Sequence, residues 1–214
     1  MKGDVFRDRT EAAHRLAAVL ADYRGMNPLV LAIPRGAVPM AKIIAGELGG
    51  EVDVVLVRKL RAPGNPEFAL GSVDESGWAY LAEHALHYAS DEYLEREKQA
   101  QIAIIRERRV QYTPVHPPIE PKGRVVIVVD DGLATGSTMI SALHALRARG
   151  ADRLICAVPV SPPDALEHVR PYADETVCLL APPNFYAVGQ FYGDFPQVDD
   201  EEVIAVLREG RGTL

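Results

Sequence analysis

Apolar residues along the chain recur in two patterns, one with the period of a helix and one continuous, and the two patterns alternate. Asp8 and Glu11 form a capping box that predicts a helix start, after which apolar residues recur every three or four positions as far as Leu20. The continuous apolar run 28–33 predicts a buried strand, and the small-residue segment 34–48 predicts the helix that follows it. The chain therefore begins with a helix, a strand and a second helix.

The same order of strand and helix continues to the end of the chain. Runs rich in valine, isoleucine and leucine predict buried strands, and segments with helical period separate them. Strands are expected over 52–57, 124–129, 153–158 and 176–180, and helices over 91–111, 137–149, 163–169 and 199–207. Because alternating strands and helices are typical of parallel sheets, we predict an α/β fold whose sheet carries helices on both faces.

Composition narrows the classes of protein to which this chain can belong. With 214 residues, 48% of them hydrophobic, the chain is long and apolar enough to form one domain over 1–214. Its net charge of −7 argues against a nucleic-acid partner held by a broad basic surface. No apolar run is long enough to cross a membrane, and residues 1–9 lack a signal-peptide core. Cys156 and Cys178 lie in apolar segments and indicate buried thiols, so we expect a cytoplasmic protein.

The most informative segment, residues 125–138, joins the most hydrophobic strand to a helix through a turn of small and hydroxyl residues. Asp130 and Asp131 follow the strand at its carboxyl end, where ligands bind in open α/β sheets. Gly132 and Gly136 allow close approach to the backbone, and the start of a helix favours an anion. The hydroxyl donors of the turn are Thr135, Ser137 and Thr138. This pattern predicts a ligand that combines a phosphate with vicinal hydroxyls or a bound cation.

Two other motifs fit this segment less well. A Walker phosphate loop requires a lysine directly before its Ser or Thr, and no lysine lies between Gly132 and Thr138. A receiver domain also gathers acids at strand ends, but its acids do not precede a Thr-Gly-Ser-Thr helix start such as the one at 135–138.

The segment closely resembles the phosphoribosyl pyrophosphate (PRPP) signature of the type I phosphoribosyltransferases, in which a hydrophobic strand, two acids and a Thr-Gly phosphate loop follow one another. The resemblance extends over nearly the whole chain, because segments 6–9, 33–37 and 188–189 are similar to a poorly characterised bacterial and archaeal branch of that family. It implies the type I phosphoribosyltransferase fold, with a helical insertion over 84–112 and a small C-terminal hood over 181–214.

The resemblance implies a magnesium-dependent glycosyltransferase of the pentosyltransferase kind. A nitrogenous acceptor, with a nucleobase as the expected class, would displace pyrophosphate from C1 of PRPP to give a ribonucleotide. Mg²⁺ would be the cofactor, held indirectly at Asp130 and Asp131 through ribose hydroxyls or water. The implied partners are PRPP and a small-molecule acceptor, and a homodimer is compatible with the family. The alternative is a regulatory protein that senses PRPP or a nucleotide with the same fold and without catalysis.

Individual roles follow from the resemblance at matching positions. Asp130 and Asp131 would bind the ribose hydroxyls. The 5′-phosphate would lie in a loop formed by Gly132, Leu133, Ala134, Thr135, Gly136, Ser137 and Thr138. Arg35 and Gly36 would bind pyrophosphate, in a turn that often holds a cis peptide in relatives. Arg58 and Lys59 match a basic pair that acts on the leaving group, and 61–77 matches a mobile loop that closes over PRPP.

Acceptor recognition is the part of the pattern that the sequence specifies least. Purine-salvage relatives often carry an acid directly before the loop threonine, and this chain has Ala134 there. Glu67, in the expected mobile loop, is the candidate proton acceptor in its place, and a solvated loop acid is the alternative. Phe185, Tyr186 and Val188 match the hood that stacks on the acceptor, although packing of the tail onto the sheet explains the two aromatic residues equally well.

Overall fold

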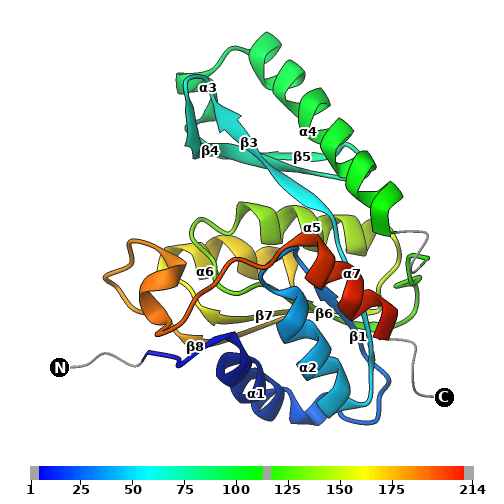
Figure 1. Ribbon diagram of the computed structural model, residues 1–214. Helices are drawn as coiled ribbons and strands as arrows, with labels where there is room; N and C mark the ends of the chain where they lie inside the picture. Colours follow the sequence, from blue (N-terminus) through cyan, green and yellow to red (C-terminus); the bar gives the residue numbers. More distant parts are fainter. Residues whose placement is uncertain (1–4, 113–116, 210–214) are drawn as a thin grey trace.

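A parallel sheet of five strands forms the centre of the protein, in the order β2-β1-β6-β7-β8 (Figure 1). The computed structural model describes residues 5–112 and 117–209, apart from the side chains of Pro66 and Glu67. The strands are β1 (Leu29–Ala32), β2 (Glu51–Val54), β6 (Val125–Val129), β7 (Arg153–Val160) and β8 (Glu175–Leu180). β1 and β6 therefore lie side by side, and their carboxyl ends bring two separate turns to the same edge of the sheet.

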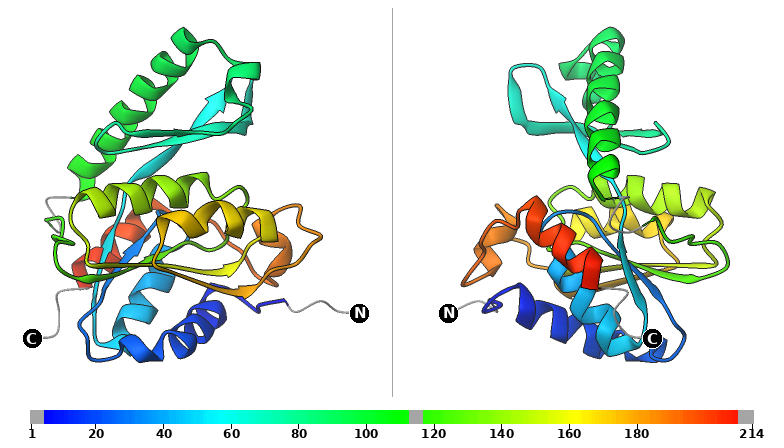
Figure 2. Two further views of the ribbon diagram at one scale, coloured as in Figure 1. Left: turned by 180° about the vertical axis from the view of Figure 1, so that it is seen from behind. Right: turned by 45° about the vertical axis from the view of Figure 1, so that its right-hand side comes forward.

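Helices cover both faces of this sheet, as the sequence predicts. Figures 1 and 2 show α1, α2 and α7 on one face and α5 and α6 on the other. These helices are α1 (Arg9–Val19), α2 (Val38–Leu48), α5 (Ser137–Ala148), α6 (Pro163–Val169) and α7 (Asp200–Glu209). Along β6, Ile127 and Val129 pack toward α1 and α2, whereas Val126 and Val128 pack toward α5 and α6. This alternation explains why the strand is apolar at every position.

The boundaries of several helices follow from local signals that the sequence contains. Asp8 caps α1, because its Oδ1 accepts a hydrogen bond of 2.8 Å from the Glu11 amide. The Glu11 carboxylate in turn accepts a bond of 2.7 Å from the Arg7 amide. Gly49 ends α2 in the left-handed conformation that glycine adopts most readily. Among residues 5–112 and 117–209, no helix combines the length and apolarity that a bilayer crossing requires.

Residues 57–112 form an arm that stands on the carboxyl side of the sheet (Figures 1 and 2). Its three antiparallel strands are β3 (Val57–Ala62), β4 (Asn65–Asp74) and β5 (Ala79–Leu81). The short helix α3 (Ala85–Tyr88) and the long helix α4 (Asp91–Tyr112) follow. The two helices account for the expected helical insertion over 84–112.

The arm corrects two expectations from the sequence. The segment 61–77, which matches the family's mobile loop, is not without regular structure: strands occupy most of it, and Gly64, with φ 72°, makes a tight turn between β3 and β4. The expected strand over 52–57 is two elements, since β2 ends at Val54 and β3 begins at Val57. Arg58 and Lys59 thus lie within β3 and not in a turn after β2. Whether the hairpin moves when a ligand binds stays a prediction.

Four contacts hold the base of the arm against the central domain. The Ser72 hydroxyl of β4 donates to the Ser137 carbonyl at 2.6 Å and lies 2.7 Å from the Ser141 hydroxyl, both on α5. The Trp78 ring stacks on the His144 ring of α5 with centroids 3.6 Å apart. At the end of α4, the Tyr112 hydroxyl donates to Asp200 of α7 at 2.8 Å. The arm is therefore anchored at its base on both faces of the sheet.

Candidate functional site

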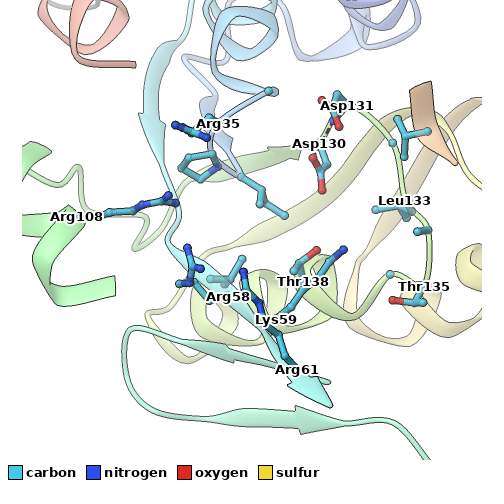
Figure 3. Close-up of a pocket in the computed structure, with 18 residues that line it drawn as sticks. Arg35, Arg58, Lys59, Arg61, Arg108, Asp130, Asp131, Leu133, Thr135 and Thr138 are labelled. Carbon is cyan, nitrogen blue, oxygen red and sulfur yellow. Dashed lines mark hydrogen bonds between the residues drawn. The ribbon is translucent and has the colours of Figure 1, made fainter. Parts of the chain in front are cut away.

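A cavity of about 430 Å³ opens at the carboxyl edge of the sheet, between the central domain and the arm. The turns after β1 and β6 form one wall, and β3 with the end of α4 forms the other. The lining residues include Arg35, Gly36, Arg58, Lys59, Arg61, Arg108, Asp130, Asp131, Ala134, Thr135, Gly136, Thr138 and Val188. Figure 3 shows the guanidinium groups on one side and the two aspartates on another. The structure thus brings together most of the candidate residues that the sequence identifies.

The acid pair, Asp130 and Asp131, follows β6 directly and is half-buried at the cavity wall. The Asp131 amide donates to Asp130 Oδ1 at 2.9 Å, so the backbone itself orients the first carboxylate. Arg9 binds the second carboxylate, because its Nε and Nη2 lie 2.9 and 2.8 Å from Asp131 Oδ2. The Tyr192 hydroxyl donates to the Asp131 carbonyl at 2.6 Å.

The surroundings of the two acids raise their pKa values to different degrees. Burial, together with the neighbouring Asp131 carboxylate, holds the pKa of Asp130 well above its ordinary value. Burial also raises the pKa of Asp131, but the hydrogen bonds from Arg9 oppose that rise. Lys59 is the cation that acts most on Asp130, and it does so through space without a hydrogen bond. Hydrogen bonds from the hydroxyl groups of a ligand, or a cation bound with it, would favour the ionised form of Asp130 more than that of Asp131.

The loop 132–138 turns the chain from β6 into α5 with its backbone toward the cavity. Gly136 has a φ of 79°, and a Cβ there would lie 2.7 Å from Val169 Cγ2, so both conformation and space require glycine. Within the described part of the chain, the amides of Ala134, Thr135 and Gly136 donate to no backbone carbonyl. These free donors stand before the positive end of the α5 dipole, which is the arrangement that binds phosphate.

Two members of this loop are less available for that role. Leu133 lines the main cavity, but its amide donates to the Val160 carbonyl at 3.0 Å and its side chain is buried. Ser137 is also buried, with its hydroxyl 3.1 Å from that of Thr135, and it lines a separate cavity of about 260 Å³ behind the loop. Thr135 and Thr138 line the main cavity. The structure therefore favours the hydroxyls of Thr135 and Thr138 over that of Ser137 as hydrogen-bond donors to an anion in the main cavity.

The turn after β1 carries Arg35 and Gly36 to the same cavity. The Pro34–Arg35 peptide bond is cis, as the family resemblance implies. Arg35 Nη1 lies 3.7 Å from Asp200 Oδ2, at the start of α7. Gly36 lies so close to the acid pair that a Cβ would fall 2.1 Å from Asp131 Oδ2 and 2.9 Å from Arg9 Nη2. Any side chain at this position would displace the Arg9–Asp131 pair.

Five cations line one side of the cavity and form what we call the cationic cluster: Arg35, Arg58, Lys59, Arg61 and Arg108. Burial lowers the pKa of Arg58, and the neighbouring charges of Arg108, Arg61 and Arg35 lower it further. Arg58 Nε donates to Gln101 on α4 at 2.6 Å, which fixes its direction without neutralising it. Mutual repulsion of this kind indicates a site for a polyanion.

The candidate acceptor residues divide between the cavity and the surface. Val188 lines the cavity and packs against Gly132, where a Cβ would lie 2.6 Å from its Cγ1. Phe185 stacks on Phe191, with ring centroids 5.3 Å apart, and does not line the cavity. The Tyr186 side chain is 91% exposed. The Glu67 side chain lies outside the described residues. Stacking of Phe185 or Tyr186 on an acceptor thus stays a prediction, which their present positions do not favour.

Two functional candidates were missed by sequence reasoning. Arg9 belongs to the segment 6–9 that carries the family resemblance, so a signal was present but gave no role. Arg108 lies on the strongly charged helix α4, where its contribution to the cavity cannot be separated from an ordinary solvated face. Its position depends on the arm folding back over the sheet edge, which no local pattern indicates.

The acid pair fits a magnesium ion only in company with a ligand. In the described part of the chain, no cluster of three or more His, Cys, Asp or Glu side chains could hold a metal. Mg²⁺ is often bound by one or two carboxylates together with substrate phosphates and waters. Asp130 and Asp131 supply two carboxylates in a cavity that several cations also line.

Comparison with known proteins assigns the family. The phosphoribosyl transferase domain profile matches residues 8–196, and the chain belongs to this family. Two Mycobacterium tuberculosis proteins, provisionally named as phosphoribosyl transferases, are 38% identical over 205 residues, which is 95% of this chain and 46% of theirs. The chain thus spans about half the length of these curated relatives. The crystal structure of TT1426 from Thermus thermophilus is 49% identical, with a TM-score of 0.81 over 96% of this chain and 98% of that one. The expected α/β phosphoribosyltransferase fold is confirmed.

The two acids are expected to respond to different degrees to amide substitution. Because the folded protein raises the pKa of Asp130, it binds that proton more tightly than the unfolded chain does, and the ionised group costs stability at neutral pH. Asp130→Asn should therefore raise the melting temperature of the unligated protein, by about 2–4 °C per kcal/mol regained. The gain should shrink as the pH falls toward the ordinary aspartate pKa of about 4.

Asp131→Asn should raise the melting temperature by less, because burial also raises the pKa of Asp131 but the substitution removes the carboxylate that the Arg9 hydrogen bonds stabilise. Thermal unfolding of both variants between pH 5 and pH 8, without ligand, measures the contrast. Equal shifts of the same sign would show that Arg9 does not distinguish the two carboxylates.

Gly36→Ala should disrupt the site with little effect on the fold. The new methyl group would overlap Asp131 Oδ2, so we expect ribose-phosphate ligands to bind at least about tenfold more weakly, the cost of one charged hydrogen bond. Gly46→Ala is the matched control, since Gly46 lies on α2 and a Cβ added there would meet no atom within 4 Å. Calorimetry with PRPP and magnesium measures both variants, and unchanged affinity for Gly36→Ala would remove Gly36 and Asp131 from the ligand site.

Proposed function

We propose that this protein is a magnesium-dependent phosphoribosyltransferase, which transfers the phosphoribosyl group of PRPP to a nitrogenous acceptor and releases pyrophosphate. The observation that carries the proposal is that one cavity is lined by the loop 132–138, by the acid pair and by the cationic cluster. Free loop amides before α5 suit the 5′-phosphate, and the cationic cluster suits the pyrophosphate. The acid pair suits the two ribose hydroxyls.

Each wall of the cavity supports one requirement of the reaction. As the bond from C1 to pyrophosphate breaks, negative charge grows on the leaving group. The side chains of Arg35, Arg58 and Lys59 line the cavity and would stabilise that charge. The carboxylates of Asp130 and Asp131 accept hydrogen bonds from the ribose hydroxyls and stabilise the positive charge that develops on the sugar. Bound magnesium would add charge neutralisation at the pyrophosphate. The chain therefore contributes mainly position and electrostatic stabilisation.

The acceptor is proposed to be a planar nitrogen heterocycle of the nucleobase class. Val188 forms an apolar edge of the cavity next to Gly132, against which a planar ring could pack. Ala134 supplies no carboxylate to take up the acceptor proton. An acceptor that reacts at an unprotonated ring nitrogen would need no such base at this position.

Pyrophosphate release tests the proposal. With PRPP and Mg²⁺, the wild-type protein should release pyrophosphate only when one of a panel of purines, pyrimidines and carboxylated heteroaromatic amines is present. Arg108→Met should weaken PRPP binding about tenfold through loss of one charged contact, whereas Arg106→Met, exposed on the same helix, should not.

The result also separates catalysis from sensing. Tight binding of PRPP without pyrophosphate release for any acceptor would favour the regulatory alternative. Absence of PRPP binding altogether would contradict both functions.

The arm should become more rigid when PRPP binds. Its four cavity cations repel one another in the free protein, and pyrophosphate would neutralise them and link β3 to the end of α4. Hydrogen exchange of residues 57–74 and 101–110 should slow with Mg²⁺ and PRPP, while β7, buried in the central sheet, serves as an unaffected control. Equal exchange of the arm with and without ligand would argue against closure over the substrate.

A further inference from the structure

Arg9 makes its contacts next to the cavity without lining it. It is the first residue of α1, and its side chain is only 12% exposed. Nε and Nη2 both bind Asp131 Oδ2, at 2.9 and 2.8 Å. Asp131 Oδ1 accepts no hydrogen bond from the described residues, so one carboxylate oxygen is held by the protein and the other is left for a ligand. Arg9 thus binds the acid without lining the cavity.

The same guanidinium also binds the C-terminal tail. Nη1 donates to the Pro196 carbonyl at 2.6 Å, and the guanidinium carbon lies 3.7 Å above the centre of the Phe195 ring. Phe195 stacks on Tyr192 with centroids 4.7 Å apart, and the Tyr192 hydroxyl returns to the Asp131 carbonyl. These contacts connect α1, the C-terminal tail and the end of β6 in one continuous network.

The contacts around Arg9 and Asp131 are tight at Gly36. Gly36 lies against both partners, since a Cβ there would fall within 3 Å of Asp131 Oδ2 and of Arg9 Nη2. A lysine in place of Arg9 could not make the two bonds to one carboxylate oxygen, the tail bond and the ring contact at once, because it carries a single ammonium group.

We infer that Arg9 is a positioning residue, which fixes Asp131 for the ribose hydroxyls and joins the C-terminal tail to the ribose site. This inference rests on the proposed function, because it names how one of its substrate groups is held. It assigns the N-terminal helix a part in substrate binding although no residue of that helix lines the cavity.

The test compares Arg9→Met and Arg9→Lys with Arg15→Met, which removes an exposed arginine of the same helix that lies over Phe6. The probes are PRPP with Mg²⁺ and inorganic pyrophosphate with Mg²⁺, measured by calorimetry. Arg9→Met should weaken PRPP binding about tenfold or more and leave pyrophosphate binding within about twofold, since the cationic cluster is untouched. Arg9→Lys should recover only part of the loss, and Arg15→Met should match the wild type.

A double-mutant cycle shows whether Arg9 acts through Asp131. In the Asp131→Asn background, Arg9→Met should cost little further PRPP affinity, whereas a direct contact with the ligand would give additive losses. Additive losses, or equal weakening of PRPP and pyrophosphate together with a general loss of stability, would overturn the inference. So would wild-type affinity for PRPP in Arg9→Met. Failure of the wild-type protein to bind PRPP is a separate result, which would overturn the proposed function and the inference with it.

Discussion

Two carboxylates held side by side at the end of a buried strand repel one another, and the site is organised around that repulsion. The fold places Asp130 and Asp131 where burial disfavours charge, and it neutralises only the second of them directly, through Arg9. The first depends on the hydrogen bond from the Asp131 amide and on the charge of Lys59, which acts through space. An unligated site of this kind stores unfavourable electrostatic energy, which a polyhydroxyl ligand with a cation can release on binding.

The cavity sets the acid pair opposite the cationic cluster, and most of that cluster belongs to a different structural unit. The acids, the loop 132–138 and Arg35 come from the central domain, whereas Arg58, Lys59, Arg61 and Arg108 come from the arm. Neither unit alone would bind a ligand with phosphates at both ends and hydroxyls between them. The site therefore depends on how firmly the base of the arm is held by Ser72, Trp78 and Tyr112.

The sequence predicts the central domain well because local signals there agree with the fold. The capping box at Asp8, the continuous strand at 125–129 and the glycine at 49 each specify an element that the structure contains. In the arm, the long helix α4 was expected, but the β3–β4 hairpin was not, because glycine, proline and asparagine around its turn suggested a loop. Arg9 and Arg108 join the site through contacts between residues about 120 apart or across the arm, which no single-sequence pattern contains.

The pairing of β3 with β4 places the cations of β3 at different distances from Ser72, the residue through which β4 contacts α5. Lys59 lies directly opposite Ser72 in the strand register, and Ser72 is tied to the first turns of α5. Arg61 pairs with Ala69, further along the hairpin toward its turn. A rotation of the arm about the serine contact would therefore displace Arg61 more than Lys59, so that one cation keeps its place in the cavity while the other changes its distance from the opposite wall.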